Sequence, residues 1–280
     1  MSNESEPVFD WPAGKLAAVC LTFDVDAESG FIGDDASYAR RLTSLSEGRY
    51  GVTRGLPRLL ELLGSMAIPA TFFVPGDTAD RHPQVVADIL EAGHEIGHHG
   101  HRHLRSDLIG EREQREEIEL GLAALERAGA PRPRGYRSSS WELTPETFAL
   151  LGEHGFEYDS SCMGDDRPYF EYWDGQRLLE LPVHWSLDDW PHFGWSIDRG
   201  GNLTSADQLL ETWRSEYATA RDERRSLVLT MHPEVIGRPY RLNRVLRRLL
   251  EEIDADGSAW FARLDELAAN VTPILGSAAA

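Results

Sequence analysis

The chain has 280 residues, of which 41% are hydrophobic, so it can bury the core of one large α/β domain or of two small ones. Its 47 acidic side chains outnumber the 28 basic ones and give a formal net charge of −19, which repels nucleic acid and anionic membranes. The acidic, polar first residues carry no export signal, and no later apolar run could span a bilayer. We therefore expect a cytoplasmic protein without nucleic-acid or membrane partners.

Short β-branched or apolar runs alternate along the chain with amphipathic segments, which is typical of a parallel sheet with crossover helices. Apolar side chains at helical spacing, such as Leu59, Leu63 and Met66, predict the helices. Seven or eight such units predict a closed or nearly closed barrel. We expect an N-terminal extension over 1–15 and a single catalytic domain over 16–275. The predicted strands cover residues 16–23, 70–74, 94–97, 134–137, 157–160, 178–182, 227–231 and 260–262.

Residues 163–201 depart from this alternation, because they place Trp173, Trp185, Trp190 and Trp195 among Asp, Pro and Gly residues. Long irregular segments of this kind more often carry function than not. We therefore predict an aromatic-rich insertion that either lines a substrate pocket or covers a neighbouring subunit, and both roles can hold at once.

Two carboxylates and two imidazoles form the strongest chemical pattern. Asp24 and Asp26 end the first predicted strand, where positions i and i+2 face the same way. His99 and His103 are four residues apart, so a helical turn after the third strand would put both rings on one face. One carboxylate and two imidazoles make a three-ligand metal site whose open position can activate water, with Asp24 left beside it as an ionised base.

Other interpretations of these segments are weaker. Residues 24–30 imitate the first half of a calcium loop, but they follow a strand and their glycine falls one position late. The pattern His-Glu-x-x-His occurs at 94–98, yet a zinc protease needs it on a helix, and in a strand the two rings lie about 13 Å apart. The histidine-rich tract could also be a surface metal-scavenging segment.

Four motifs, in this order and spread over most of the chain, together resemble those of the polysaccharide deacetylases, the NodB-type family 4 carbohydrate esterases. The resemblance is closest to the intracellular-type branch, which includes peptidoglycan-deacetylase-like proteins and hydrolases of cyclic imides or ureides. It implies an α/β fold built as a distorted (β/α) barrel of about seven strands, and a homo-oligomer. The motifs are Thr22-Phe23-Asp24-Val25-Asp26, His99-x-x-x-His103, Gly135-Tyr136-Arg137-Ser138-Ser139-Ser140-Trp141 and Leu229-Thr230-Met231-His232-Pro233.

Carried over residue by residue, the resemblance implies a role for each matching position. Asp24 is the general base, held in place by Arg137, and His232 is the general acid that protonates the departing nitrogen. The metal ligands are Asp26, His99 and His103. Such a ligand set suits Zn²⁺, which we expect first, and also Co²⁺, Ni²⁺, Mn²⁺ or Fe²⁺.

The resemblance leaves the substrate open. Many family members have Arg-x-Pro-Tyr where this chain has Arg137-Ser138-Ser139-Ser140-Trp141, which removes a rigid proline and an aromatic donor near the oxyanion. We expect the substrate, a small molecule or a glycan, to contact aromatic faces and carboxylate acceptors. The expected residues are Trp141, Trp185, Asp188, Asp189 and Trp190.

Three functions fit these residues. The first is deacetylation of an N-acetylated carbohydrate. Because a cell-wall deacetylase should be exported, the second is a cytoplasmic hydrolase that opens cyclic imides or ureides with the same site. The third is an inactive carbohydrate-binding protein, which would not need the matched base and acid that Asp24 and His232 provide.

Overall fold

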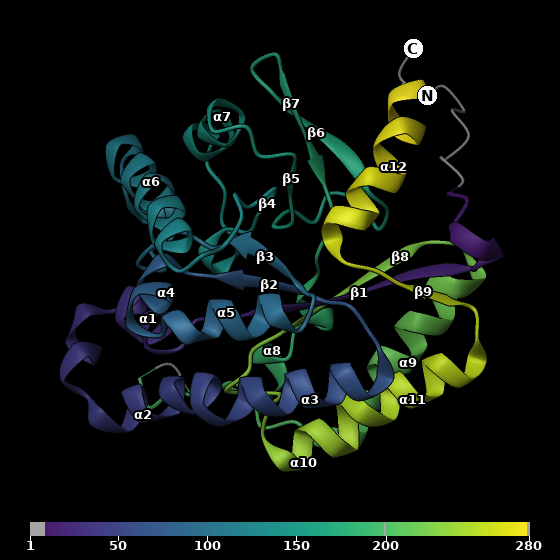
Figure 1. The fold of residues 1–280 in the computed structure, drawn as a ribbon, viewed down its shortest axis with the longest axis horizontal. Coiled ribbons are helices and arrows are strands. Elements are labelled where there is room, and N and C mark those ends of the chain that lie inside the picture. The colour runs from purple at the N-terminus through teal and green to yellow at the C-terminus, as the bar shows by residue number, and fades with distance from the viewer. Residues whose placement is uncertain (1–8, 199, 279–280) are drawn as a thin grey trace.

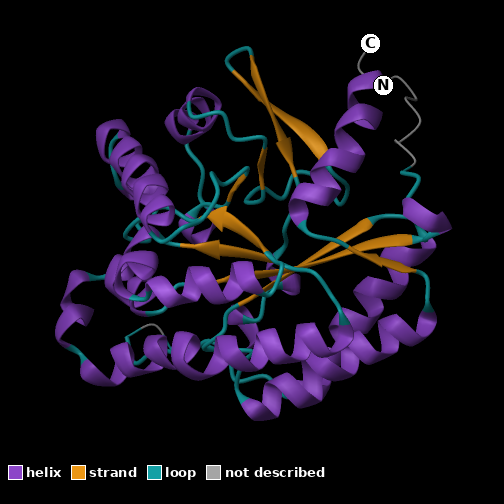
Figure 2. Cartoon of the chain, in the orientation of Figure 1, coloured by secondary structure: helices purple, strands orange, loops and turns teal. Residues whose placement is uncertain are grey.

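The computed structural model describes residues 9–198 and 200–278, and its centre is a curled β-sheet covered by helices (Figures 1 and 2). Within this part of the chain the sheet has nine strands in the order β6-β7-β5-β4-β3-β2-β1-β8, and β9 also pairs with β1. The strands are β1 (Ala17–Asp24), β2 (Thr71–Val74), β3 (Glu95–His98), β4 (Gly135–Tyr136), β5 (Tyr158–Asp159), β6 (Tyr169–Trp173), β7 (Gln176–Glu180), β8 (Ser226–Met231) and β9 (Ala259–Phe261).

All neighbouring strands pair in parallel except β6 and β7, which are antiparallel. The sheet curls into a half-barrel and does not close, because β6 and β8 end the order without pairing to each other. This confirms the predicted α/β fold with a distorted barrel. The helices are α1 (Glu28–Asp34), α2 (Leu42–Tyr50), α3 (Leu56–Met66), α4 (Gly76–Arg81), α5 (Pro83–Glu91), α6 (Glu111–Arg127), α7 (Pro145–Glu153), α8 (Trp190–Phe193), α9 (Ala206–Asp222), α10 (Pro239–Arg241), α11 (Arg247–Asp256) and α12 (Leu264–Ala278).

Strand β1 is buried along its whole length, as expected of a central parallel strand. Its residues alternate between two hydrophobic cores. Val19 and Leu21 pack in the core with α3, α9 and α11, whereas Ala18 and Cys20 pack in the core with α12 (Figure 1). Asp24 continues the second side and therefore projects into the half-barrel.

The structure describes the predicted N-terminal extension and the predicted insertion only in part. Residues 1–8 of the extension, and residue 199 of the insertion, lie outside the described residues. Phe9 and Trp11, however, are buried in the core beside α12, so the last part of the extension packs as part of the fold.

Within 163–201 the predicted strand at 178–182 corresponds to β7, but its antiparallel partner β6 was not predicted. The pair β6–β7 is joined at Asp174-Gly175, both of which have positive φ values (44° and 77°). Such backbone angles suit a tight hairpin turn, and an Asp-Gly pair between aromatic and apolar residues is a recognised hairpin signal. The remaining strands lie where they were expected, although β4 and β5 have only two residues each.

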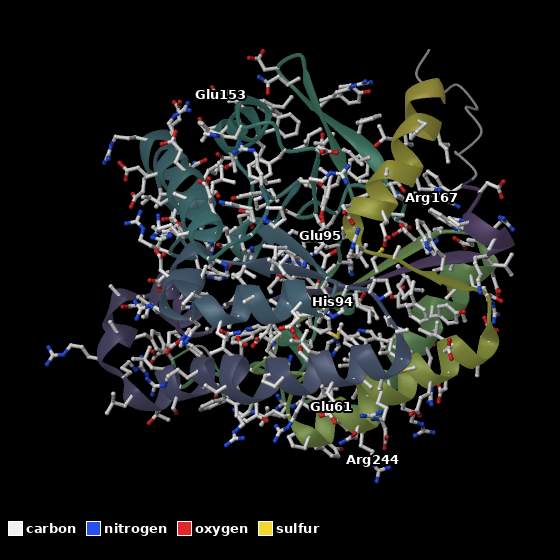
Figure 3. The ribbon with its side chains drawn as sticks, in the orientation of Figure 1. Glu61, His94, Glu95, Glu153, Arg167 and Arg244 are labelled. Carbon is white, nitrogen blue, oxygen red and sulfur yellow. The ribbon has the colours of Figure 1, made fainter. Side chains whose placement is uncertain are left out.

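The His-Glu-x-x-His pattern lies along β3 rather than on a helix, as predicted. His94 precedes β3, and its ring packs against Phe72 with 5.2 Å between the ring centroids. His98 ends the strand and donates from Nε2 to the carbonyl of Ile118 at 3.0 Å. Figure 3 shows His94 and Glu95 at the centre of the fold. The two imidazoles are thus engaged separately.

Within the described residues, no helix combines the length and the apolar character needed to cross a bilayer.

Candidate active site

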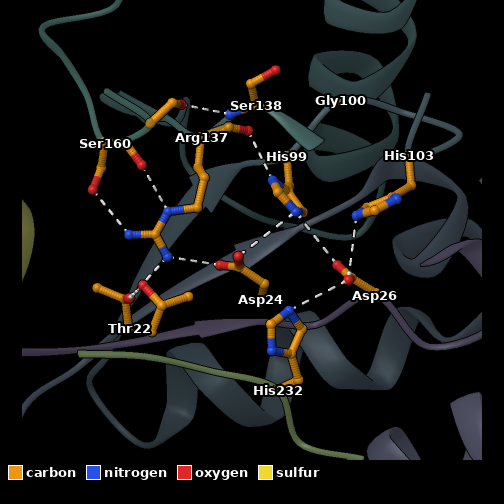
Figure 4. Close-up of polar contacts among 12 residues, drawn as sticks. Thr22, Asp24, Asp26, His99, Gly100, His103, Arg137, Ser138, Ser160 and His232 are labelled. Carbon is orange, nitrogen blue, oxygen red and sulfur yellow. Dashed lines mark hydrogen bonds and ion pairs between the residues drawn. The ribbon is translucent and has the colours of Figure 1, made fainter. Parts of the chain in front are cut away.

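The predicted site residues meet at the carboxyl ends of the parallel strands, where side chains from successive βα units converge. Asp24 is the last residue of β1, and Asp26 follows it by two positions. His99 follows β3, Arg137 follows β4 and His232 follows β8. Figure 4 shows these side chains pointing toward one another.

Asp26, His99 and His103 form a buried group in which one possible ligand atom from each residue lies within 4.8 Å of the other two. His99 Nε2 is 3.4 Å from Asp26 Oδ1, and His103 Nε2 is 3.3 Å from Asp26 Oδ2. The expected helical turn over 99–103 does not form. A loop with positive φ at Gly100 (70°) and His103 (59°) brings the rings together instead.

The surroundings of these three residues fit a divalent cation. His99 donates from Nδ1 to the carbonyl of Arg137 at 2.8 Å, which leaves the lone pair of Nε2 directed at Asp26. Burial lowers the pKa of His99, so its ring is held neutral, as a ligand must be. Asp26 Oδ1 is buried and has no hydrogen-bond partner among the described residues. An orphaned carboxylate oxygen between two imidazoles is the donor set that a metal ion satisfies.

The charge of Asp26 is also secured by its neighbours. Burial alone would raise the pKa of this carboxyl, but the imidazoles of His103, His99 and His232 outweigh burial and hold the pKa below its usual range. Asp26 is therefore an anion in this setting.

Arg137 fixes the orientation of Asp24. The guanidinium is fully buried and donates from Nη1 to Asp24 Oδ1 and to Thr22 Oγ1, both at 2.8 Å. Its Nε and Nη2 donate to the carbonyl and hydroxyl of Ser160, both at 2.9 Å, and its plane lies over the Phe73 ring at 4.3 Å. A buried charge is tolerated when its donors are paired in this way.

The second oxygen of Asp24 is not the one that Arg137 binds. Asp24 Oδ2 faces His99 Nε2 at 3.9 Å, on the side of the candidate metal site. The carboxylate is thus held through one oxygen while the other faces the candidate metal site.

His232 is held by Asp189. Its Nδ1 donates to Asp189 Oδ1 at 2.8 Å, and its backbone N–H donates to both carboxylate oxygens at 3.2 and 3.1 Å. Burial lowers the pKa of His232, but the hydrogen bond to Asp189 and the charges of Asp188, Asp189 and Asp26 raise it well above its ordinary value. The ring is therefore an imidazolium, and its Nε2 faces Asp26 Oδ2 at 3.8 Å.

A cavity of about 340 Å³ opens over this centre. The rings of Trp141 and Trp185 stack in its wall, with 4.2 Å between centroids, and Trp190 and Trp195 line it as well. Ser140 and Trp141 have positive φ (56° and 59°), so the segment that departs from the family pattern is the one that brings Trp141 into the wall.

Of the five residues predicted to contact substrate, four line the cavity: Trp141, Trp185, Asp188 and Trp190. Asp189 does not line it. This carboxylate is fully buried, and its oxygens are occupied by His232, so its place is behind the imidazole rather than at the substrate.

Ser160 and Glu234 are among the residues of the site that were not anticipated. Ser160 anchors Arg137, and the only signal for it was a polar residue at the end of the predicted strand 157–160. Glu234 lines the cavity two residues after His232, and burial raises its pKa well above the ordinary value.

A second group of possible ligands lies apart from the cavity lining. Asp159, Cys162 and Glu180 bring their oxygen and sulfur atoms within 4.8 Å of one another. Both carboxylates accept hydrogen bonds from the backbone N–H of Ser161, each at 3.0 Å. Asp159 Oδ1 also accepts from Ser161 Oγ at 2.9 Å, and Glu180 Oε1 accepts from the backbone N–H of Cys162 at 3.1 Å. Donors of the protein itself thus already bind both carboxylates.

The half-barrel and the convergent carboxylates and imidazoles define an α/β protein with a candidate metal site at the carboxyl ends of its strands. Residues 16–158, slightly more than half of the chain, match the family model described as polysaccharide deacetylase. The chain belongs to the polysaccharide deacetylase family.

Individual relatives span nearly the whole chain. A solved structure from Mycobacterium smegmatis, assigned to the polysaccharide deacetylases, is 41% identical with a TM-score of 0.90, covering 95% of this chain and 93% of its own. The peptidoglycan deacetylase of Helicobacter pylori is 27% identical over 285 residues, which cover 91% of this chain and 96% of that protein. The structure of PuuE allantoinase is 24% identical with a TM-score of 0.82, covering 95% and 94% of the two chains, and shows the shared fold.

Proposed function

We propose that this chain is a metal-dependent hydrolase of non-peptide amide C–N bonds. One observation carries the proposal: a single cavity brings together a three-ligand metal site, a carboxylate fixed by Arg137 and an imidazolium fixed by Asp189. A binding protein needs no base and acid beside a metal site, so this arrangement favours catalysis over binding alone.

Asp26, His99 and His103 would hold the cation, with Zn²⁺ as the metal we propose first for this O,N,N donor set. When bound, a divalent cation supplies Lewis acidity that lowers the pKa of water and polarises the scissile carbonyl. Asp24 Oδ2 accepts the proton of the attacking water while Arg137 holds Oδ1. His232 then delivers its Nε2 proton to the amide nitrogen, which is a poor leaving group until it is protonated.

For the substrate, we propose an N-acetylated carbohydrate. The stacked Trp141 and Trp185 offer flat faces for a sugar ring, and the polar side chains around them offer partners for its hydroxyls. The name of the Helicobacter pylori relative agrees with this chemistry. An anionic substrate is disfavoured, because Arg105 is the only lysine or arginine among the lining residues of the described cavity, against the carboxyl groups of Asp24, Asp26, Asp34, Glu142, Asp188 and Glu234.

A second candidate is ring opening of a cyclic imide or ureide. The size of the cavity supports it, because about 340 Å³ lies at the lower end of the range for small-molecule sites. Aromatic walls would also suit a small planar ring.

One assay separates the candidates. Zinc-loaded protein would be tested for acetate release from N-acetylglucosamine and its oligomers, and for ring opening of succinimide and hydantoin. Acetate release supports the deacetylase proposal, and activity on the rings alone rejects it in favour of the second candidate. If the metal-loaded protein binds the sugars without cleaving any of these amides, the hydrolase proposal is wrong.

A further inference from the structure

Two adjacent carboxylates, Asp188 and Asp189, have different surroundings. Asp189 is fully buried behind His232, and both of its oxygens receive hydrogen bonds from that residue. Asp188 is only 3% exposed, but it lines the catalytic cavity. The two residues therefore cannot serve the same purpose.

Asp188 has one engaged oxygen and one free oxygen. Its Oδ1 accepts a hydrogen bond from the backbone N–H of Trp190 at 2.8 Å and lies 3.6 Å from His232 Nδ1. Its Oδ2 has no hydrogen-bond or ion-pair partner among the described residues. Burying a carboxylate without enough donors is costly, and burial raises the pKa of Asp188 to about 7. Because Asp188 lines the cavity, the missing donor can come from what fills the cavity, either water or a bound ligand.

The backbone around Asp188 holds this oxygen in place. Asp188 forms a parallel bridge with Thr230 of β8, and the N–H of Asp189 donates to the Thr230 carbonyl at 3.1 Å. Asp188 is thereby attached to the same strand that carries His232 at its end. The free carboxylate oxygen and the imidazole consequently keep a fixed relation to each other.

We propose that Asp188 binds the leaving side of the substrate by accepting a hydrogen bond from an N–H or O–H group that lies within a few bonds of the scissile nitrogen. This inference rests on the proposed function, because His232 is the group that meets the leaving nitrogen and Asp188 flanks the same imidazole. The inference favours amides with a neighbouring donor, such as amino sugars or ureides, as substrates. It disfavours simple imides and N-alkyl amides.

The proposal is tested by measuring protein variants on paired substrates, so that the Asp188 carboxylate and the substrate donor are removed separately and together. Two pairs of substrates are compared, and in each pair only the first member carries a neighbouring N–H or O–H donor. The pairs are N-acetylglucosamine with N-cyclohexylacetamide, and hydantoin with succinimide. For the pair that the wild type cleaves, Asp188→Asn should lower kcat/KM by at least about tenfold on the donor-bearing member and by less than about threefold on the other. Equal losses on both members would overturn the proposal.

Asp189→Asn is the matched control, one residue away. Because Asp189 contacts His232 and not the cavity, this variant should lower turnover on both members of a pair to the same extent. Metal content and melting temperature of both variants would be measured alongside, so that a loss of fold is recognised as such.

A binding measurement keeps the inference separate from the proposed function. Calorimetry would follow glucosamine and cyclohexylamine, the two product amines, on zinc-loaded protein. Asp188→Asn should weaken glucosamine binding at least about fivefold and leave cyclohexylamine unchanged. If the wild type cleaves no amide but this difference holds, the proposed function fails and the role of Asp188 stands. If glucosamine binding is absent or does not depend on Asp188, the inference is wrong.

Discussion

Asp24 and Asp26 lie two residues apart at the end of β1, yet they contact different partners, which suit them to different roles in the proposed mechanism. Asp24 is held by a buried guanidinium, whereas Asp26 faces two imidazoles and keeps one oxygen without a hydrogen bond. A base must hold and release a proton, and a ligand must stay an anion. In the proposed mechanism, the different partners therefore keep Asp24, the base, distinct from Asp26, the metal ligand.

Substituting each aspartate separates these roles. Asp24→Asn should leave the metal content unchanged and lower turnover by at least about a hundredfold, because only the proton acceptor is lost. Asp26→Asn is the matched control and should lose the metal together with activity. The measurements are metal analysis and kcat for each purified variant. Full activity in Asp24→Asn would contradict its assignment as the base.

The pH profile reports on His232. The ring acts as an acid, so activity should fall as pH rises through its raised pKa. Asp189→Asn removes a hydrogen bond and a negative charge that raise this pKa, so the alkaline limb of the kcat profile should move to lower pH. An unmoved alkaline limb would mean that another group donates the proton.

Among the helices and strands, two glycines let the segment after His232 pack directly against a helix. A π-helical turn, Gly51–Gly55, precedes α3, and a Cβ on Gly55 would lie 2.0 Å from the Pro233 carbonyl oxygen. A Cβ on Gly51 would lie 2.6 Å from Glu234 Oε2. The absence of side chains at these positions thus lets the segment that follows β8, next to His232, approach the helix closely.

Gly55→Ala should therefore destabilise the fold by about 1–3 kcal/mol and reduce turnover, because the clash is with backbone that cannot rotate away. Gly64→Ala within α3 is the control: a Cβ there meets nothing within 4 Å, and alanine should stabilise the helix by about 0.5–1 kcal/mol. Urea unfolding of both variants makes the comparison. Equal stability of the two variants would show that this packing is not tight.

Elements with a strong periodic pattern could be predicted from the sequence, and elements fixed by a few long-range contacts could not. Buried β1 and the amphipathic α3 follow from local residue choice alone. The loop over 99–103 was predicted as helical from spacing, but positive backbone angles at Gly100 and His103 decide its shape. These angles depend on contacts with distant residues, such as the hydrogen bond from the Gly76 N–H to the Gly100 carbonyl.

The same distinction holds for the site. The candidate ligands, base and acid lie on motifs, so it could be predicted from the sequence that these side chains meet. Asp189 was expected at the substrate but does not line the cavity, and Ser160 was not anticipated. Their roles depend on which side chain faces them across the half-barrel, and spacing along one strand holds no such information.

At the scale of the whole molecule, a buried carboxyl group ties the sheet to the last helix. Glu95 begins β3 and accepts hydrogen bonds from Thr71 Oγ1 at 2.7 Å and from Tyr158 Oη at 2.9 Å. The backbone N–H of Asp265, in the first turn of α12, donates to it at 3.1 Å. Burial, with the charge of Asp265, raises the pKa of Glu95 to about 7.

This raised pKa predicts a pH dependence of stability. The folded state keeps the Glu95 proton that the unfolded chain releases near pH 4.5, so the contribution of Glu95 is fully present below about pH 4.5 and is lost as pH rises through about 7. Relative to wild type, Glu95→Gln should gain up to about 3 kcal/mol in unfolding free energy between pH 5 and 8. Urea unfolding at several pH values measures this difference, and a difference that stays constant with pH would contradict the assignment.

The proposed chemistry depends on one divalent cation bound between Asp26, His99 and His103. Anomalous diffraction at the zinc edge, on crystals of zinc-loaded protein, would locate this ion. A single strong peak is expected within about 2.0–2.2 Å of an Asp26 oxygen and of Nε2 of both histidines. A peak at Asp159, Cys162 and Glu180 instead, or no peak within reach of Asp26, would show that the ion does not bind there.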